Sequence, residues 1–268
     1  MENNSAMVIA QISDSHLFAD PAGLHCGVNV YQNLLAVLFE LKNNSKISHI
    51  IFTGDLTQDH SDESYQQFVQ AIETTNITVP IHFLLGNHDE PELFKRYLVN
   101  APFCSETVIE NSHWQIILLN SKSETPAGVV DKKELAQLKA VLDTDKSQLL
   151  FMHHHPIDVG YFIDKHGLKN KESFWQAIDD CQSKNTRNNE SSIKGIACGH
   201  IHQGLTLTPE KTGKSTTLYT CPATSIQFDP TIDTVSALPT GPGYRLFYLS
   251  EESSLTTEVK YLPPMEAS

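Results

Sequence analysis

Short runs of apolar residues, rich in Ile, Val, Leu and Phe, recur through most of the chain and are separated by mixed segments. Each run is continuous rather than alternating, which is typical of a strand that is buried on both faces. We therefore predict strands within residues 7–13, 49–54, 81–86, 114–120, 148–153 and 193–199.

Several of the intervening segments place apolar residues three or four positions apart, which is the spacing of one face of a helix. The residues that show it are Leu34, Leu38 and Leu41, then Tyr65, Phe68, Val69 and Ile72, then Leu135, Leu138 and Leu142. Strands that alternate with helices predict an α/β fold of packed layers. Because no repeat or low-complexity linker interrupts the pattern, we predict one domain over residues 1–268.

The pattern changes after about residue 203. The segments 204–228, 243–250 and 255–263 resemble strands joined by Gly, Pro and Thr turns, without a helical spacing. We expect this tail to add antiparallel strands to the core. The polar stretch "SKNTRNNESS" at 183–192 is the segment most typical of a loop.

The charge of the chain excludes some classes of partner. A formal net charge of -13 argues against a nucleic-acid groove and against a basic membrane-binding surface, since both need clustered Lys and Arg. The only arginines are Arg96, Arg187 and Arg245. If the substrate carries phosphate, its charge must be met largely by something other than an arginine clamp.

The cysteines and the N-terminus indicate a reduced, cytoplasmic setting. Five widely spaced cysteines without a CxxC pair disfavour both a disulfide framework and a zinc knuckle. The start "MENNSAMVIAQIS" has neither a basic leader nor a long apolar core, so we expect no signal peptide. No stretch approaches the roughly 18 apolar residues of a membrane span.

Five of the predicted strands end in clusters of carboxylate, amide and imidazole side chains. The clusters are Asp14-Ser15-His16, Gly54-Asp55, Gly86-Asn87-His88-Asp89, His153-His154-His155 and Gly199-His200-Ile201-His202. In an open α/β sheet, ligands bind beyond the carboxyl ends of the strands, so all five clusters are expected to face one crevice.

The donor atoms of these clusters suit divalent ions such as Mn, Fe or Zn, and thiolates are absent from them. Asp14 and His16, two positions apart, would lie on the same side of an extended segment, and His200 and His202 have the same relation. The two aspartates, one amide and four imidazoles exceed what one metal needs. They predict two ions that share a carboxylate.

The ordered set D-x-H, GD, GNHD, H and GHxH resembles the calcineurin-like metallophosphoesterase superfamily, and within it the bacterial class III cyclic-nucleotide phosphodiesterases. The narrower resemblance also rests on "TGDLTQDHSDESYQQF", "WQIILLNS", "DKHGLKN", "FDP" and "GPGYR", which extend over most of the chain. It implies a β-sandwich of two mixed sheets flanked by helices. It also implies two divalent metal ions as cofactors, Fe²⁺ or Mn²⁺ first and Zn²⁺ as a further candidate.

The resemblance also implies a role for each donor. One ion would be held by Asp14, His16, Asp55 and His202, and the other by Asp55, Asn87, His153 and His200. His153 is preferred to His154 because the family places the ligand directly at the strand end. Asp59, the carboxylate nearest to the "GD" motif, is expected to face solvent or to support a ligand rather than bind metal.

The implied reaction is hydrolysis of 3',5'-cyclic AMP to 5'-AMP by a hydroxide that bridges the two ions. His88 would be the general acid that protonates the leaving 3'-oxygen, oriented by Asp89 or Asp59. The residues expected at the substrate are His16, Asp55, Asn87, His88, His153 and His202. Tyr161, Phe162, Phe228 and Tyr244 are candidates to stack on the base, although ordinary packing explains each of them as well.

Three other functions share part of the pattern. The same metal core would serve a 2',3'-cyclic nucleotide, a glycerophosphodiester or a nucleotide conjugate. An interaction module with a vestigial site would lack ligands or the equivalent of His88, and neither is missing. A phosphatase of the protein-phosphatase kind would carry arginines beside its motifs, whereas Arg96 is the only one nearby.

Overall fold

The computed structural model describes residues 5–142, 144–184 and 192–264, and two six-stranded mixed sheets form its centre. In the first sheet the strand order is β14-β13-β1-β4-β5-β6. Its parallel strands are β1 (Ser5–Ile12), β4 (His49–Phe52), β5 (Ile81–Phe83) and β6 (Phe103–Cys104). The tail supplies its antiparallel strands, β13 (Gly243–Ser250) and β14 (Leu255–Tyr261).

The second sheet has the order β11-β12-β10-β9-β8-β7. Its parallel strands are β8 (Trp114–Leu118), β9 (Ser147–Met152), β10 (Ile193–Cys198) and β12 (Leu218–Thr220). The antiparallel edges are β7 (Val108–Glu110) and β11 (Thr206–Leu207), and β2 (Leu24–His25) pairs with β3 (Val28–Asn29) in a separate hairpin.

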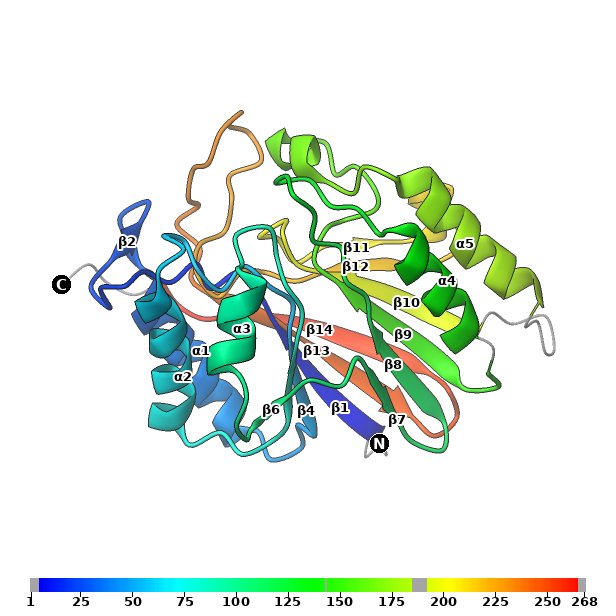
Figure 1. Ribbon diagram of the computed structural model, residues 1–268, viewed down its shortest axis with the longest axis horizontal. Coiled ribbons are helices and arrows are strands. Elements are labelled where there is room, and N and C mark those ends of the chain that lie inside the picture. The colour runs from blue at the N-terminus through cyan, green and yellow to red at the C-terminus, as the bar shows by residue number, and fades with distance from the viewer. Residues whose placement is uncertain (1–4, 143, 185–191, 265–268) are drawn as a thin grey trace.

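Helices cover the outer face of each sheet, so the molecule has four layers (Figure 1). On the first sheet lie α1 (Val30–Asn43), α2 (Asp62–Thr75) and α3 (Pro91–Tyr97), and on the second lie α4 (Lys132–Val141) and α5 (Lys171–Lys184). Two short helices, η1 (Phe162–His166) and α6 (Pro209–Thr212), lie in connections. No helix among the described residues is both long and apolar enough to cross a membrane.

Both faces of the central strands are buried, as their continuous apolar runs predict. In β1, Ile9 packs with Phe151 in the cluster between the two sheets, whereas its neighbour Ala10 packs with Leu34 under the helices. Successive side chains of a strand point to opposite faces, so a strand between two apolar layers needs apolar residues at every position. The predicted class, an α/β sandwich of two mixed sheets flanked by helices, is confirmed.

The secondary-structure predictions differ from the structure at several places, and α3, η1 and the short strands β2, β3, β6 and β7 are among the elements that were not predicted. The helix α5 was not predicted, although Phe174, Trp175, Ile178 and Cys181 carry a helical spacing and lie buried in the core of the second sheet. The tail contains the single turn α6, because Pro209 starts it and Gly213, in the left-handed region, ends it. The predicted loop at 183–192 is wrong at its start, where α5 continues, and residues 185–191 lie outside the described residues.

Candidate metal centre

The clusters that follow β1, β4, β5, β9 and β10 meet at one end of the two sheets. One group of donor atoms comes from Asp14, His16 and His202. The Nε2 atoms of His16 and His202 are 3.1 Å apart, and His202 Nε2 lies 3.3 Å from Asp14 Oδ1. Residues separated by 186 positions are thus brought within the span of a single ion.

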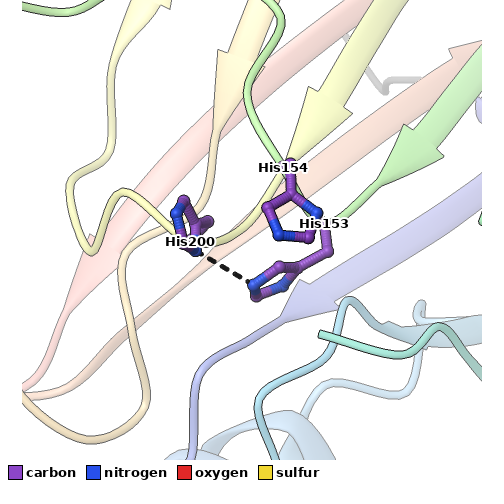
Figure 2. A group of neighbouring side chains, drawn as sticks. All are labelled: His153, His154 and His200. Atoms are coloured by element: carbon purple, nitrogen blue, oxygen red, sulfur yellow. Dashed lines mark hydrogen bonds between the residues drawn. The ribbon is translucent and has the colours of Figure 1, made fainter. Parts of the chain in front are cut away.

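A second group of donor atoms lies at the ends of β5, β9 and β10. His153 Nε2 is 3.1 Å from His200 Nδ1 and 3.2 Å from Asn87 Oδ1. Figure 2 shows the imidazoles of His153 and His200 facing each other although they leave different strands.

Asp55 lies between the two groups. Its Oδ2 atom is 3.3 Å from His153 Nε2 in the second group and 3.8 Å from His16 Nε2 in the first. Its Oδ1 accepts a hydrogen bond from the backbone N–H of His88 at 2.9 Å, which fixes the direction of the carboxylate. A carboxylate held in this way can be shared by two ions.

The hydrogen bonds of the imidazoles leave lone pairs directed into each group. His153 Nδ1 is 2.7 Å from the carbonyl oxygen of Thr53, and His202 Nδ1 is 2.7 Å from that of Ile226. Since a carbonyl only accepts, each Nδ1 carries the hydrogen and each Nε2 of a neutral ring offers its lone pair. Lone pairs that converge at such distances repel one another unless a cation lies between them, so the donor set fits metal ions.

Two of the donor imidazoles, those of His16 and His200, are buried. Burial lowers the pKa of both imidazoles well below the usual value, which favours the neutral, metal-binding form. Although burial opposes it, the Asp55 carboxylate raises the pKa of His153 to about 9, so a metal ion at His153 Nε2 would have to displace a proton from this ring.

Many of the donor residues have a backbone conformation that L-residues rarely adopt. The φ angle is positive at Asp14 (56°), His16 (45°), Asp55 (55°), His200 (67°) and His202 (55°). Such strain costs of the order of 1–3 kcal/mol per residue and concentrates at functional sites. It also corrects the sequence prediction, because neither Asp14–His16 nor His200–His202 is extended, and His200 and His202 face different groups.

The glycines before Asp55 and Asn87 allow two loops to touch. A Cβ atom on Gly86 would lie 2.1 Å from Asp55 Oδ1, and one on Gly54, where φ is +97°, would lie 2.3 Å from the backbone N of Gly86. The two loops therefore approach each other so closely that no larger residue fits at either position.

Asp89 holds these two loops together. Its buried carboxylate accepts hydrogen bonds from the backbone N–H groups of Asp55, Gly86 and Leu56 at 2.7–2.8 Å. Burial and the nearby charge of Asp55 raise its pKa, and the N–H donors oppose this rise. The prediction that Asp89 or Asp59 orients His88 is wrong, since Asp59 accepts from Ala19 and Ser61 instead.

His88 is held by rings rather than by a carboxylate. It stacks on His60 with the ring planes 8° apart, and its edge meets His16 at a centroid distance of 5.0 Å. Its buried Nδ1 has no partner within the described structure. Burial, opposed in part by Asp55, lowers the pKa of this imidazole, so its protonated form is a stronger acid than free histidine.

The three consecutive histidines have different surroundings. His154 uses both ring nitrogens, with Nδ1 2.8 Å from Ser121 Oγ and Nε2 3.2 Å from the carbonyl oxygen of Pro126. His155 Nε2 lies 3.0 Å from Asp164 Oδ1. Of the three, His153 alone directs a nitrogen toward Asp55.

A pocket of about 430 Å³ opens over the donor groups, within the range of small-ligand sites. Phe162 and Phe228 line it together with His16, His88 and His202. The other two aromatic candidates do not line it. The hydroxyl of Tyr161 donates to the carbonyl of Ile201, and Tyr244 is buried in the core under the first helix layer.

The rim of the pocket contains residues to which the sequence assigned no role. They are Pro126, Ile163, Lys165, His166, Asp233, Thr234 and Val235. Several belong to or adjoin "DKHGLKN" and "FDP", so the family resemblance was the only available signal. Neither described arginine joins them, because Arg96 pairs with Asp62 and Arg245 is buried against carbonyls of Thr220 and Leu205. Arg187 lies outside the described residues.

Known proteins resemble the chain over nearly its full length. A probable cyclic nucleotide phosphodiesterase of Colwellia psychrerythraea is 54% identical over 263 residues, which are 97% of either chain. The 3',5'-cyclic adenosine monophosphate phosphodiesterase CpdA of Escherichia coli K12 is 33% identical, over 95% of this chain and 89% of that protein. The corresponding CpdA of Vibrio vulnificus is 31% identical, over 97% and 92%.

The fold is shared with a solved phosphatase. A purple acid phosphatase from yellow lupin seeds superposes with a TM-score of 0.58 at 14% identity, over 95% of this chain and 51% of the lupin chain. Residues 7–204, which include every donor described above, match the model of the calcineurin-like phosphoesterase family. The chain therefore belongs to the calcineurin-like phosphoesterase family.

Proposed function

We propose that this chain hydrolyses 3',5'-cyclic AMP to 5'-AMP at a centre of two divalent ions that share Asp55. The observation that carries the proposal is the position of Asp55 Oδ2 between His16 Nε2 and His153 Nε2, at 3.8 and 3.3 Å. The substrate is suggested by the relatives named CpdA, which are similar to this chain almost from end to end.

The two donor groups suggest how the ligands are divided. Asp14, His16, Asp55 and His202 would hold one ion, and Asp55, Asn87, His153 and His200 the other. The mixture of imidazole and oxygen donors suits Fe²⁺, Mn²⁺ or Zn²⁺. When bound, such a pair would withdraw charge from the phosphoryl oxygens and lower the pKa of a water between them, which makes hydroxide available near neutral pH.

The reaction requires a proton at the leaving oxygen. Water adds to phosphorus, the bond from phosphorus to the ribose 3'-oxygen breaks, and that oxygen takes up a proton to become a hydroxyl. His88 is suited to donate it, because it lines the pocket beside the donor groups and burial makes its imidazolium more acidic. Its contacts with His60 and His16 hold the ring in place without using Nδ1.

A substrate panel and two variants test the proposal. With Mn²⁺ or Fe²⁺ added, we expect the protein to prefer 3',5'-cyclic AMP to cyclic GMP, 2',3'-cyclic AMP and a glycerophosphodiester. His88→Ala should keep both metals and lose roughly 10²- to 10⁴-fold in turnover, the usual contribution of a proton donor. Asp55→Ala should lose metal as well as activity.

Each part of the proposal can fail separately. Preference for another member of the panel would overturn the substrate and leave the chemistry. Full activity of His88→Ala would show that His88 is not the acid. Two metals retained in Asp55→Ala would show that Asp55 is not a ligand shared by both ions.

A further inference from the structure

The pocket over the donor groups has one apolar side, which the hydrolytic chemistry does not use. We name Phe162, Ile163, Phe228 and Val235 the apolar wall; all four line the pocket. Ile163 and Phe228 belong to a small buried cluster, separate from the three main cores, against which Phe162 packs. The wall is therefore built from η1 and from the segment after β12, which meet only in the folded chain.

The two phenyl rings of the apolar wall have different tasks. Phe228 is buried and stacks on His202, with ring centroids 3.8 Å apart and planes at 7°. One of its two faces is thus occupied by a residue of the donor group. Phe162 is half-buried, and its contacts with Tyr161 and Phe228 are inclined at 67° and 57°, so neither ring stacks parallel on it.

The order of these rings matches the order of groups in a nucleotide. The rings follow one another as His202, Phe228 and Phe162, the last pair with centroids 5.2 Å apart. One phenyl ring therefore separates the donor group from Phe162. In a nucleotide one ribose ring separates the phosphate from the base. A phosphate at the donor group would leave its base beside Phe162.

The charge on the rim favours a neutral group at this wall. Besides the donor residue Asp55, the pocket is lined by two charged side chains, Lys165 of η1 and Asp233 of the opposite segment, which pair with each other at 3.1 Å. The pair joins the two sides of the apolar wall and leaves little net charge there. A neutral aromatic base fits this combination better than glycerol or a second phosphate does.

We propose that the apolar wall is the nucleobase subsite and that the Phe162 ring stacks on the base. The inference rests on the proposed function, in that it assumes a nucleotide whose phosphate lies at the donor groups. It goes beyond that function by assigning base affinity to η1 and to the segment from Phe228 to Val235.

Equilibrium binding of two ligands isolates the base. 5'-AMP and ribose 5-phosphate share the phosphate and the sugar, and only the first carries a base. Titration calorimetry on the manganese-loaded protein should show that the wild type binds 5'-AMP more tightly than ribose 5-phosphate. Phe162→Leu should weaken 5'-AMP binding by roughly 5- to 150-fold, the range for loss of one base–aromatic stack, and leave ribose 5-phosphate unchanged.

Two further variants act as controls. Phe162→Trp keeps an aromatic face and should retain the affinity for 5'-AMP. Phe39→Leu makes the same kind of change at a phenyl ring that is 46% exposed on α1, outside the pocket, and should alter neither affinity.

The results separate the subsite from the function. Each of three results would overturn the subsite. Phe162→Leu could lose the same affinity for both ligands, or it could lose no affinity for 5'-AMP. The third result is a wild type that binds the two ligands equally tightly. Failure of the wild type to hydrolyse 3',5'-cyclic AMP would overturn the proposed substrate. That failure leaves the binding comparison intact, because the titrations measure binding of 5'-AMP and ribose 5-phosphate and not hydrolysis of 3',5'-cyclic AMP.

Discussion

Replacing the buried carboxylate of Asp89 by alanine removes the acceptor of three backbone hydrogen bonds. The N–H groups of Asp55 and Gly86 donate to Oδ2, and that of Leu56 donates to Oδ1. In Asp89→Ala these donors stay inside the protein without a partner, at about 1–3 kcal/mol each. Allowing for water in the vacated space, we expect a loss of roughly 3–6 kcal/mol in the free energy of unfolding.

Asp89→Asn gives a graded comparison. Its single side-chain oxygen can replace Oδ2 and accept from both Asp55 and Gly86, while its NH₂ group meets the N–H of Leu56 and cannot accept. The N–H of Leu56 is left without an acceptor, so the expected cost is about 1–3 kcal/mol. Asp59→Ala is the matched control, because this exposed carboxylate also accepts from a backbone N–H, that of Ala19, which water can satisfy.

Urea unfolding of the four proteins measures these costs. Chelator should be present, since metal bound only to the folded state adds stability of its own. A buffer at about pH 8 keeps Asp89 ionised despite its raised pKa. The reasoning is refuted if Asp89→Ala loses no more stability than Asp59→Ala, or if the asparagine and alanine variants lose the same amount.

Two other predictions concern the histidines. Metal analysis should show that His153→Ala binds fewer metal ions than the wild type, because His153 directs Nε2 toward Asp55. His154→Ala should bind the wild-type number, because both ring nitrogens of His154 already contact Ser121 and Pro126. The reverse result would assign the metal to His154 instead of His153. At the opposite end of the sheet, burial lowers the pKa of His49 and His82 below 6.5, so the folded protein takes up protons less readily than the unfolded chain. The free energy of unfolding should therefore fall as the pH drops below 6.5, and an unchanged slope in a His49→Gln, His82→Gln double variant would contradict this.

Local patterns were sufficient for the central strands of both sheets and for the residue types at their ends, but not for the short strands β6 and β7. Apolar runs identify strands buried on both faces, and parallel strands deliver the residues after their carboxyl ends to one edge of the sheet. That is why Asp14, Asp55, Asn87, His153 and His200 were identified as neighbours from the sequence.

The sequence alone therefore determined the layers, the strand ends and the chemical types of the donors. The tertiary structure decided which atoms face each other. It placed Asp55 between His16 and His153, assigned Asp89 to the backbone of the loops and gave His88 ring contacts in place of a carboxylate. These relations join residues that are far apart along the chain, so they depend on strand register and sheet packing, which no local spacing encodes.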